Sequence, residues 1–180
     1  MREVLYGTKV SLRPIQVDDT ESIVRWRNHP DVIKYFIDQR PITEEGHTRW
    51  LEAKISTGEV YQFIIQNSQT GQGIGSVFLK DVDLYHRHGE YGIFIGEDSG
   101  RGKGYGTEAC ELLCSFAFQQ LGLERVFLRV LSHNLSAIAS YKKAGFVIEG
   151  VLRKHALINN LFCDIIIMGL LREDCINGKQ

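Results

Sequence analysis

Hydrophobic residues recur along the chain with two spacings, one typical of helices and the other typical of strands. The clearest helical pattern covers 104–120, where apolar side chains repeat every three or four positions and Gly122 supplies a stop. Its apolar positions are Ala109, Leu112, Leu113, Phe116, Ala117 and Leu121. A second helix is predicted over 134–144, with Gly145 just beyond its end.

Shorter signals predict the remaining helices and the strands. Asp18 or Asp19 can cap a helix that runs through Trp26, Pro30 begins a short helix, and 41–43 opens a third. Runs rich in β-branched and aromatic residues predict the strands. They cover 4–12, 60–66, 75–82, 90–95, 125–131, 146–153 and 162–171.

The order of these elements predicts the fold class. One strand is followed by helices, three strands, a helix, a strand, a helix and two strands. Turn residues at 67–71 and at Asn159-Asn160 join two of the strand pairs into hairpins. This order predicts an α/β protein in which helices cover the faces of a mixed sheet. A chain of 180 residues fits one domain, 1–180, with a sizeable core.

Composition and charge narrow the classes of function. Apolar residues make up 43% of the chain, charged residues 24%, and the formal net charge is -1, which disfavours nonspecific nucleic-acid binding. No apolar stretch suits a secretory leader or a membrane span, so we expect a cytoplasmic protein. The four cysteines form no C-x-x-C pair and are expected to be buried thiols rather than metal ligands.

The segment 100–107, Gly-Arg-Gly-Lys-Gly-Tyr-Gly-Thr, lies between a predicted strand and the long helix. Glycines let backbone N–H groups turn toward one point, and the helix N-terminus adds partial positive charge there. The loop therefore predicts a phosphate site, with Arg101 and Lys103 as nearby cations. It is not a Walker A loop, because Glu97 and Gly104 stand where that motif needs glycine and Ser or Thr; the dinucleotide fingerprint G-x-G-x-x-G also fails.

Two motifs carry a resemblance to a known family. Arg101-x-x-Gly104-x-Gly106 resembles the [Q/R]-x-x-G-x-[G/A] signature of the GNAT superfamily of acyl-CoA N-acyltransferases. Residues 134–146 are similar to the family's N-x-x-A-x-x-x-Y-x-x-x-G-F helix, and the resemblance covers nearly the whole chain. It implies a mixed, mostly antiparallel sheet flanked by helices, and an N-acetyltransferase that uses acetyl-CoA as cosubstrate.

The resemblance also implies which residues hold the cofactor. The strand 90–95 is similar to the family's splayed central strand, whose backbone would hold pantetheine and polarise the acetyl carbonyl. The glycine loop and the helix that begins at 134 would contact the remainder of acetyl-CoA. The implied cofactor residues are Ile93, Phe94, Ile95, Arg101, Gly102, Lys103, Gly104, Tyr105, Gly106, Thr107, Asn134, Ala137 and Lys143.

Acetyl transfer to an amine needs an acid and a base. The amine must lose a proton before it attacks the thioester, and the leaving thiolate gains from a proton. Tyr141, whose ordinary pKa is about 10, suits the acid, and Glu90 is the expected base, acting through a water. Of the residues just upstream, His86 or His88 could replace Glu90. No metal site is needed.

The acceptor is predicted by finer resemblances. Leu12-Arg13-Pro14 and the helix start at 104–109 look like the RimJ/RimL-type branch, and 26–30 with 86–89 look like PseH-type enzymes. Those enzymes acetylate a UDP-linked 4-amino sugar on the way to pseudaminic acid. The implied substrate-binding residues are Arg27, Asn28, His29, His86 and His88.

Other acceptors and one other class stay open. The RimJ/RimL-type branch includes enzymes that act on N-terminal alanine of ribosomal proteins and on spermidine, and the sequence shows no acidic cluster to attract a polyamine. A domain that binds acyl-CoA without catalysis is the alternative class. Exposed β edges near the C-terminus make a homodimer plausible.

Overall fold

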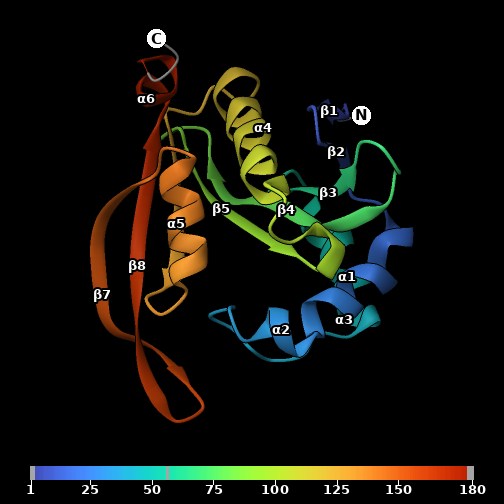
Figure 1. Cartoon of the computed structure of the whole chain (residues 1–180), viewed down its shortest axis with the longest axis horizontal. Helices are drawn as coiled ribbons and strands as arrows, with labels where there is room; N and C mark the ends of the chain where they lie inside the picture. Colours follow the sequence, from blue (N-terminus) through green and yellow to red (C-terminus); the bar gives the residue numbers. More distant parts are fainter. Residues whose placement is uncertain (1–2, 56, 178–180) are drawn as a thin grey trace.

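The computed structural model describes residues 3–55 and 57–177 and places its strands in one eight-stranded sheet (Figure 1). Along the sheet the strands are β1 (Leu5–Tyr6), β2 (Val10–Pro14), β3 (Tyr61–Asn67), β4 (Gly73–Asp83), β5 (His88–Ile95), β6 (Arg125–Leu131), β8 (Leu161–Leu171) and β7 (Val147–Ile158). Every neighbouring pair is antiparallel except β5 and β6, which run parallel. The predicted mixed, mostly antiparallel sheet with flanking helices is confirmed.

Helices cover both faces of the sheet. One face carries α4 (Tyr105–Gln119) and α5 (Leu135–Lys143), and the other carries the α1–α3 group (Figure 1). That group consists of α1 (Thr20–Asn28), α2 (Pro30–Ile33) and α3 (Glu44–Trp50), which continues as a π-type turn over Leu51–Ile55. A last helix, α6 (Arg172–Asn177), was not predicted. No helix of the described residues is long and apolar enough to span a membrane.

Alternation along the strands divides the core into two layers. Phe63 and Ile65 of β3 are buried in the cluster beneath α4, whereas Ile64 between them is buried on the opposite face with Trp26 and Phe94. Successive strand side chains point to opposite faces, so one run of apolar residues serves both layers. The sheet is therefore covered on both sides, and its central strands are inaccessible except where the sheet itself opens.

The prediction of one continuous strand over 4–12 was wrong, because the structure has two strands there, β1 and β2. The carboxylate of Glu108 on α4 accepts hydrogen bonds from the backbone N–H groups of Thr8, Lys9 and Val10, at 2.9, 2.8 and 3.0 Å. A carboxylate that accepts several backbone N–H bonds fixes a turn strongly. The break therefore depends on a residue about a hundred positions away, which the local pattern does not show.

The other predicted elements are confirmed with small changes at their ends. Asn134 caps α5, its side chain accepting from the N–H of Ala137 at 3.3 Å, and Gly145 follows with a left-handed φ of +94°. The C-terminal hairpin turns at Asn159 and Asn160, both with positive φ, as the turn residues predicted. Strand β7 runs five residues further toward that turn than expected.

Candidate active site

Strands β5 and β6 separate after only three residue pairs. His88, Gly89 and Glu90 pair with 125–127, and no further pairs follow, although β5 still pairs with β4 as far as Ile95 and β6 with β8 as far as Leu131. The facing edges beyond Glu90 thus carry backbone N–H and C=O groups that the partner strand does not bond. Such groups need another partner, so the gap suits an elongated polar ligand.

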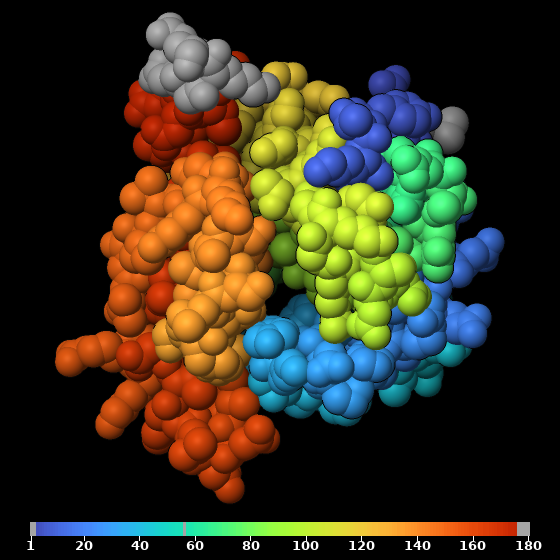
Figure 2. Space-filling view, viewed as in Figure 1, coloured from blue at the N-terminus to red at the C-terminus, as the bar shows by residue number. Residues whose placement is uncertain are grey.

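A cavity of about 750 Å³ lies at this gap. Figure 2 shows the surface hollowed between the α5 segment, the loop before α4 and the segment around α2. Ile93, Phe94 and Ile95 line it, as do Arg101 and Gly106 from the glycine loop. The cavity therefore combines the separated strands with the predicted phosphate loop.

The glycine loop takes the backbone form that the sequence predicted. Gly102 and Gly104 have φ values of +71° and +79°, in the left-handed region, and α4 begins at Tyr105 directly afterwards. Gly104 serves as the helix N-cap, so the open N-terminus of a fifteen-residue helix follows the loop. Arg101 pairs with Asp98 at 3.0 Å.

A further cation, Lys9, lies at this loop although no motif in the sequence predicts it. A side chain on Gly104 would meet the Lys9 Nζ atom at 3.3 Å, which places that ammonium beside the loop. The turn that presents Lys9 is the one held by Glu108. Since this turn is fixed by a contact between distant parts of the chain, no local motif could have found Lys9.

Helix α5 presents one face to the cavity. Asn134, Ala137 and Tyr141 line it with Ser136 and Ser140. The spacing of three and four residues puts the first three on one side of the helix. The remaining predicted cofactor residues, namely Gly102, Lys103, Gly104, Tyr105, Thr107 and Lys143, are not among the lining residues, and Lys143 is at the far end of α5.

Two of those residues have other contacts. The Tyr105 hydroxyl accepts a hydrogen bond from the Asn67 amide at 3.2 Å, and the hydroxyls of Thr107 and Ser140 lie 3.4 Å apart. The second contact joins α4 to α5. Both side chains therefore bond within the protein and do not line the cavity.

Glu90 is buried, with 6% of its surface exposed, and its carboxylate is shared between two cations. Arg129 of β6 donates to both oxygens, at 3.0 and 2.9 Å, and Lys80 Nζ lies 3.4 Å from one of them. The hydrogen bonds raise the pKa of the Arg129 guanidinium. Glu90 is the last residue of β5 paired with β6, so this ion pair lies where the two strands part.

Tyr141 lies among other aromatic rings. Its ring centroid is 6.0 Å from those of Tyr91 and Phe146. Burial, with a smaller contribution from Cys110, raises the pKa of Tyr141 well above its usual value. A raised pKa keeps the phenol protonated at neutral and mildly alkaline pH, as a proton donor requires.

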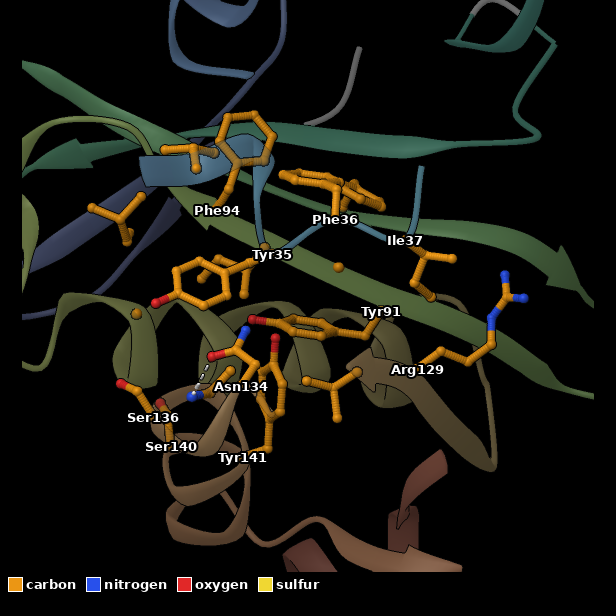
Figure 3. Close-up of a pocket in the computed structure, with 18 of the residues that line it drawn as sticks. Tyr35, Phe36, Ile37, Tyr91, Phe94, Arg129, Asn134, Ser136, Ser140 and Tyr141 are labelled. Atoms are coloured by element: carbon orange, nitrogen blue, oxygen red, sulfur yellow. Dashed lines mark hydrogen bonds between the residues drawn. The ribbon is translucent and has the colours of Figure 1, made fainter. Parts of the chain in front are cut away.

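The opposite wall of the cavity is largely aromatic. Its lining rings are Tyr35, Phe36, Trp50, Phe78 and Phe94, beside Ile37. Figure 3 shows Tyr35, Phe36 and Phe94 on one side of the cavity and Tyr141 with Asn134 on the other. Most of these residues could not be predicted from the sequence, because 35–37 follow a short helix and carry no motif.

The five predicted substrate residues do not line the cavity. The Arg27 guanidinium stacks 3.3 Å from the Phe36 ring and donates to the Asp38 carbonyl, and burial lowers its pKa to about 10. The Asn28 amide exchanges two hydrogen bonds with the Ile42 backbone, at 2.8 and 2.9 Å. Arg27 and Asn28 therefore hold the aromatic wall in place from behind.

The three predicted histidines lie outside the cavity lining. The exposed His29 caps α2, its ring nitrogen accepting from the Asp31 N–H at 3.3 Å. His86 and His88 stack with ring centroids 6.4 Å apart at the paired end of β5. Since His88 precedes Glu90 by two residues, it lies on the same face of the strand but outside the cavity lining.

Comparison with known proteins agrees with this geometry. The chain matches the Acetyltransferase (GNAT) domain family over residues 9–147, and it belongs to that family. It is therefore an N-acetyltransferase of GNAT type, and the acetyl donor of such enzymes is acetyl-CoA.

Individual relatives extend over nearly the whole chain. It is 26% identical to the uncharacterized N-acetyltransferase p20 of Bacillus licheniformis, covering 96% of this chain and 98% of the relative. It is 28% identical to spermidine N(1)-acetyltransferase of Escherichia coli K12, covering 91% and 87%. The structure of spermidine N-acetyltransferase from Vibrio cholerae with CoA and spermine has the same fold, with a TM-score of 0.88, 24% identity, and coverage of 95% and 100%.

We expect Gly104→Val to reduce acetyl-CoA affinity about tenfold or more. A left-handed φ costs a residue other than glycine about 1–2 kcal/mol, and β-branching adds to this. The loop would relax away from the conformation that aims its N–H groups, and the new side chain would crowd Lys9. Isothermal titration calorimetry with acetyl-CoA measures the change.

Gly122→Val is the matched control for this variant. Gly122 has a φ of +69° and follows the other end of the same helix, and the first carbon of a side chain added there would have no described neighbour within 4 Å. It should lose stability through similar strain but keep its acetyl-CoA affinity. An equal loss of affinity in both variants, or in neither, would contradict the assignment of the loop.

Proposed function

We propose that this enzyme acetylates a small cationic primary amine, with a polyamine such as spermidine as the first acceptor to test. The observation that carries the proposal is the cavity at the parting of β5 and β6, which has the glycine loop at one end and an aromatic wall opposite Tyr141. One end suits a phosphate-bearing donor and the other suits an organic amine. The two reactants would meet beside Tyr141.

The residues present fit acetyl-CoA. The backbone edges beyond Glu90, the helix N-terminus after Gly104, and the cations of Arg101 and Lys9 offer hydrogen bonds and positive charge along one path. Acetyl-CoA supplies an acetyl group activated as a thioester. The protein's part is to orient that group, to exclude water, and to move protons.

We assign Tyr141 as the proton donor to the leaving sulfur. Its raised pKa and its place on the cavity-lining face of α5 support this role. Phe146 and Tyr91 pack against the ring and restrict its motion. A fixed phenol is ready to donate without reorganisation of the site.

We assign Glu90 as the proton acceptor, with water between it and the amine. Arg129 bonds to both of its oxygens, so an ammonium cannot reach them directly without displacing the guanidinium. A water that bonds to the carboxylate can still carry the proton. Arg129 then positions the carboxylate.

Two observations favour a polyamine. The relatives from Vibrio cholerae and Escherichia coli that cover most of the chain act on spermidine by their names. The cavity is also lined by three carboxylates, those of Asp31, Asp38 and Glu90, together with the aromatic wall. Aromatic faces and carboxylates both attract ammonium groups. The sequence showed no acidic cluster because Glu90 lies far along the chain from Asp31 and Asp38.

The charge balance of the cavity keeps the nucleotide-linked amino sugar as a second candidate. Asp31 pairs with Lys34 at 2.7 Å, Asp38 with Arg40, and Glu90 with Arg129, so none of the three carboxylates is free of a cation. Lys34, Lys80, Arg101 and Arg129 also line the cavity. A diphosphate could use such cations, although the residues expected to bind it lie outside the lining.

Location and assembly remain proposals. We propose a cytoplasmic enzyme, and a homodimer that forms through β7. Strand β7 is the edge of the sheet, and Val147, Val151 and Leu157 on it are exposed. An exposed apolar edge strand is a ready surface for pairing.

The acceptor is tested by release of free thiol from acetyl-CoA with three amines. We expect spermidine to be consumed with a higher kcat/KM than a UDP-linked 4-amino sugar or an alanine-starting peptide. Preference for the sugar or the peptide would overturn the polyamine assignment and keep the enzyme class. Bound acetyl-CoA with no turnover of any of the three amines would also overturn that assignment.

Tyr141→Phe should lower kcat about ten- to a thousandfold while acetyl-CoA still binds, because only the donated proton is lost. Tyr6→Phe, at a tyrosine that is 80% exposed, is the control and should behave as wild type. The raised pKa also predicts that wild-type kcat does not fall through ionisation of Tyr141 near pH 10. Near-normal turnover by Tyr141→Phe would remove this residue from the mechanism.

Glu90→Gln should lower kcat/KM about tenfold or more, because the amide cannot accept the proton. Arg129→Gln is the matched variant, since it breaks the same ion pair but keeps the carboxylate. It should lose clearly less kcat/KM than Glu90→Gln. An equal loss in both variants would assign Glu90 a structural role only.

A further inference from the structure

A second, smaller pocket of about 330 Å³ adjoins the cavity. Trp50, Phe78 and Lys80 line both, so the two are neighbours with a shared wall. The packing of Trp50 and Phe78 places the smaller pocket on the face of the sheet that carries the α1–α3 group. We call it the side pocket, and its charged lining residues are Lys54, Glu59, Lys80 and Asp81.

A β-bulge turns the Asp81 side chain toward the side pocket. Between the pair that Lys80 forms with Glu90 and the next pair, β4 has one residue more than β5, and Asp81 has a left-handed φ of +49°. In a regular strand, Lys80 and Asp81 would point to opposite faces. Here both line the side pocket, whereas Val82 packs against the core beneath α4. The irregularity of the strand therefore brings a carboxylate to this pocket.

The Asp81 carboxylate is available to a ligand. The residue is exposed, and its carboxylate makes no hydrogen bond or ion pair with another described residue. Both lysines that line the side pocket already have a partner, since Lys54 pairs with Glu59 and Lys80 with Glu90. The side pocket thus has one negative charge that no lysine of its lining neutralises.

Asp81 also lies near the reacting end of the cavity. Its charge raises the pKa of the Arg129 guanidinium, after the larger effect of the hydrogen bonds to Glu90. Along the sheet, Asp81 lies beyond Glu90, on the side away from Ile95 and the glycine loop. A donor held at the glycine loop would leave this side for the acceptor.

We propose that the side pocket binds the second ammonium group of the acceptor, with Asp81 as the counterion and the rings of Trp50 and Phe78 beside the carbon chain. The inference rests on the proposed acetylation of a polyamine in the neighbouring cavity. It supplies what that cavity lacks, because all three carboxylates of the cavity lining are paired with cations. A free carboxylate and aromatic faces both attract an ammonium group. The side pocket therefore favours diamines and polyamines over monoamines.

Two matched amines isolate the second ammonium group. The diamine 1,8-diaminooctane has a chain as long as that of spermidine, and octylamine lacks its second amine. Asp81→Asn should lower kcat/KM for the diamine and for spermidine about three- to thirtyfold, but should leave that for octylamine unchanged. Release of free thiol from acetyl-CoA measures kcat/KM, and an amine that is not acetylated is compared through its inhibition constant against spermidine.

The substitution is chosen to keep the bulge. Asparagine, like aspartate, tolerates the left-handed conformation, so the backbone at this position should be preserved. The affinity for acetyl-CoA, measured by calorimetry, should therefore stay at the wild-type value. Asp18→Asn removes an exposed carboxylate that lines neither pocket, and this control should behave as wild type with every amine.

Two results would overturn the inference. An equal loss with the diamine and with octylamine would mean that Asp81 acts through Arg129 or through the shape of the bulge. An unchanged kcat/KM for both amines would mean that the side pocket does not bind the second ammonium group.

The proposed function can fail separately. Wild-type enzyme that binds acetyl-CoA but acetylates neither spermidine nor the diamine would overturn the polyamine assignment, and with it this inference. Wild-type turnover of spermidine together with an unaffected Asp81→Asn variant would overturn only the role of the side pocket.

Discussion

The candidate site depends on the separation of β5 from β6 beyond Glu90. Beyond Glu90 each strand loses its partner across the gap, yet β5 stays bonded to β4 and β6 stays bonded to β8. The facing edges beyond Glu90 therefore carry backbone groups that no strand pairs with. The cavity lies at this gap, and residues of the glycine loop and of α5 line it.

An opening in the sheet brings its two faces to one site. Tyr91 and Glu90 are consecutive residues, but the first packs under α5 and the second lies on the face covered by α1–α3. Only where the strands part can a ligand reach both faces of the sheet. The proposed proton donor and the proposed proton acceptor can thus act on one reaction from opposite faces of the same sheet.

The ion pair between Glu90 and Arg129 lies where the strands part. Glu90 ends the paired stretch of β5, and Arg129 lies two residues beyond the last paired residue of β6. Two hydrogen bonds, with Lys80 nearby, compensate for the burial of this carboxylate. The ion pair therefore links the two strands at the point where the pairing of their backbones ends.

Local sequence was sufficient to predict the features that depend on neighbouring residues. Local propensity and backbone freedom explain the periodicity of α4, the cap at Asn134, the turn at Asn159-Asn160 and the left-handed glycines of the loop. The motifs that contain the loop and the Asn134 cap identified the family. Which side chains meet at the site depends instead on tertiary packing. Arg27 and His29 belong to a suggestive motif, yet they support the wall or cap a helix.

Tertiary packing also explains why some residues of the site could not be predicted from the sequence. The aromatic wall, Arg129 opposite Glu90, and Lys9 at the loop come from segments far apart along the chain. Pairing across a sheet and contacts such as that of Glu108 with the first turn bring them together. Local sequence determines the backbone of most elements, because local propensity acts over a few residues. The break between β1 and β2 and the composition of the cavity depend instead on how distant elements pack.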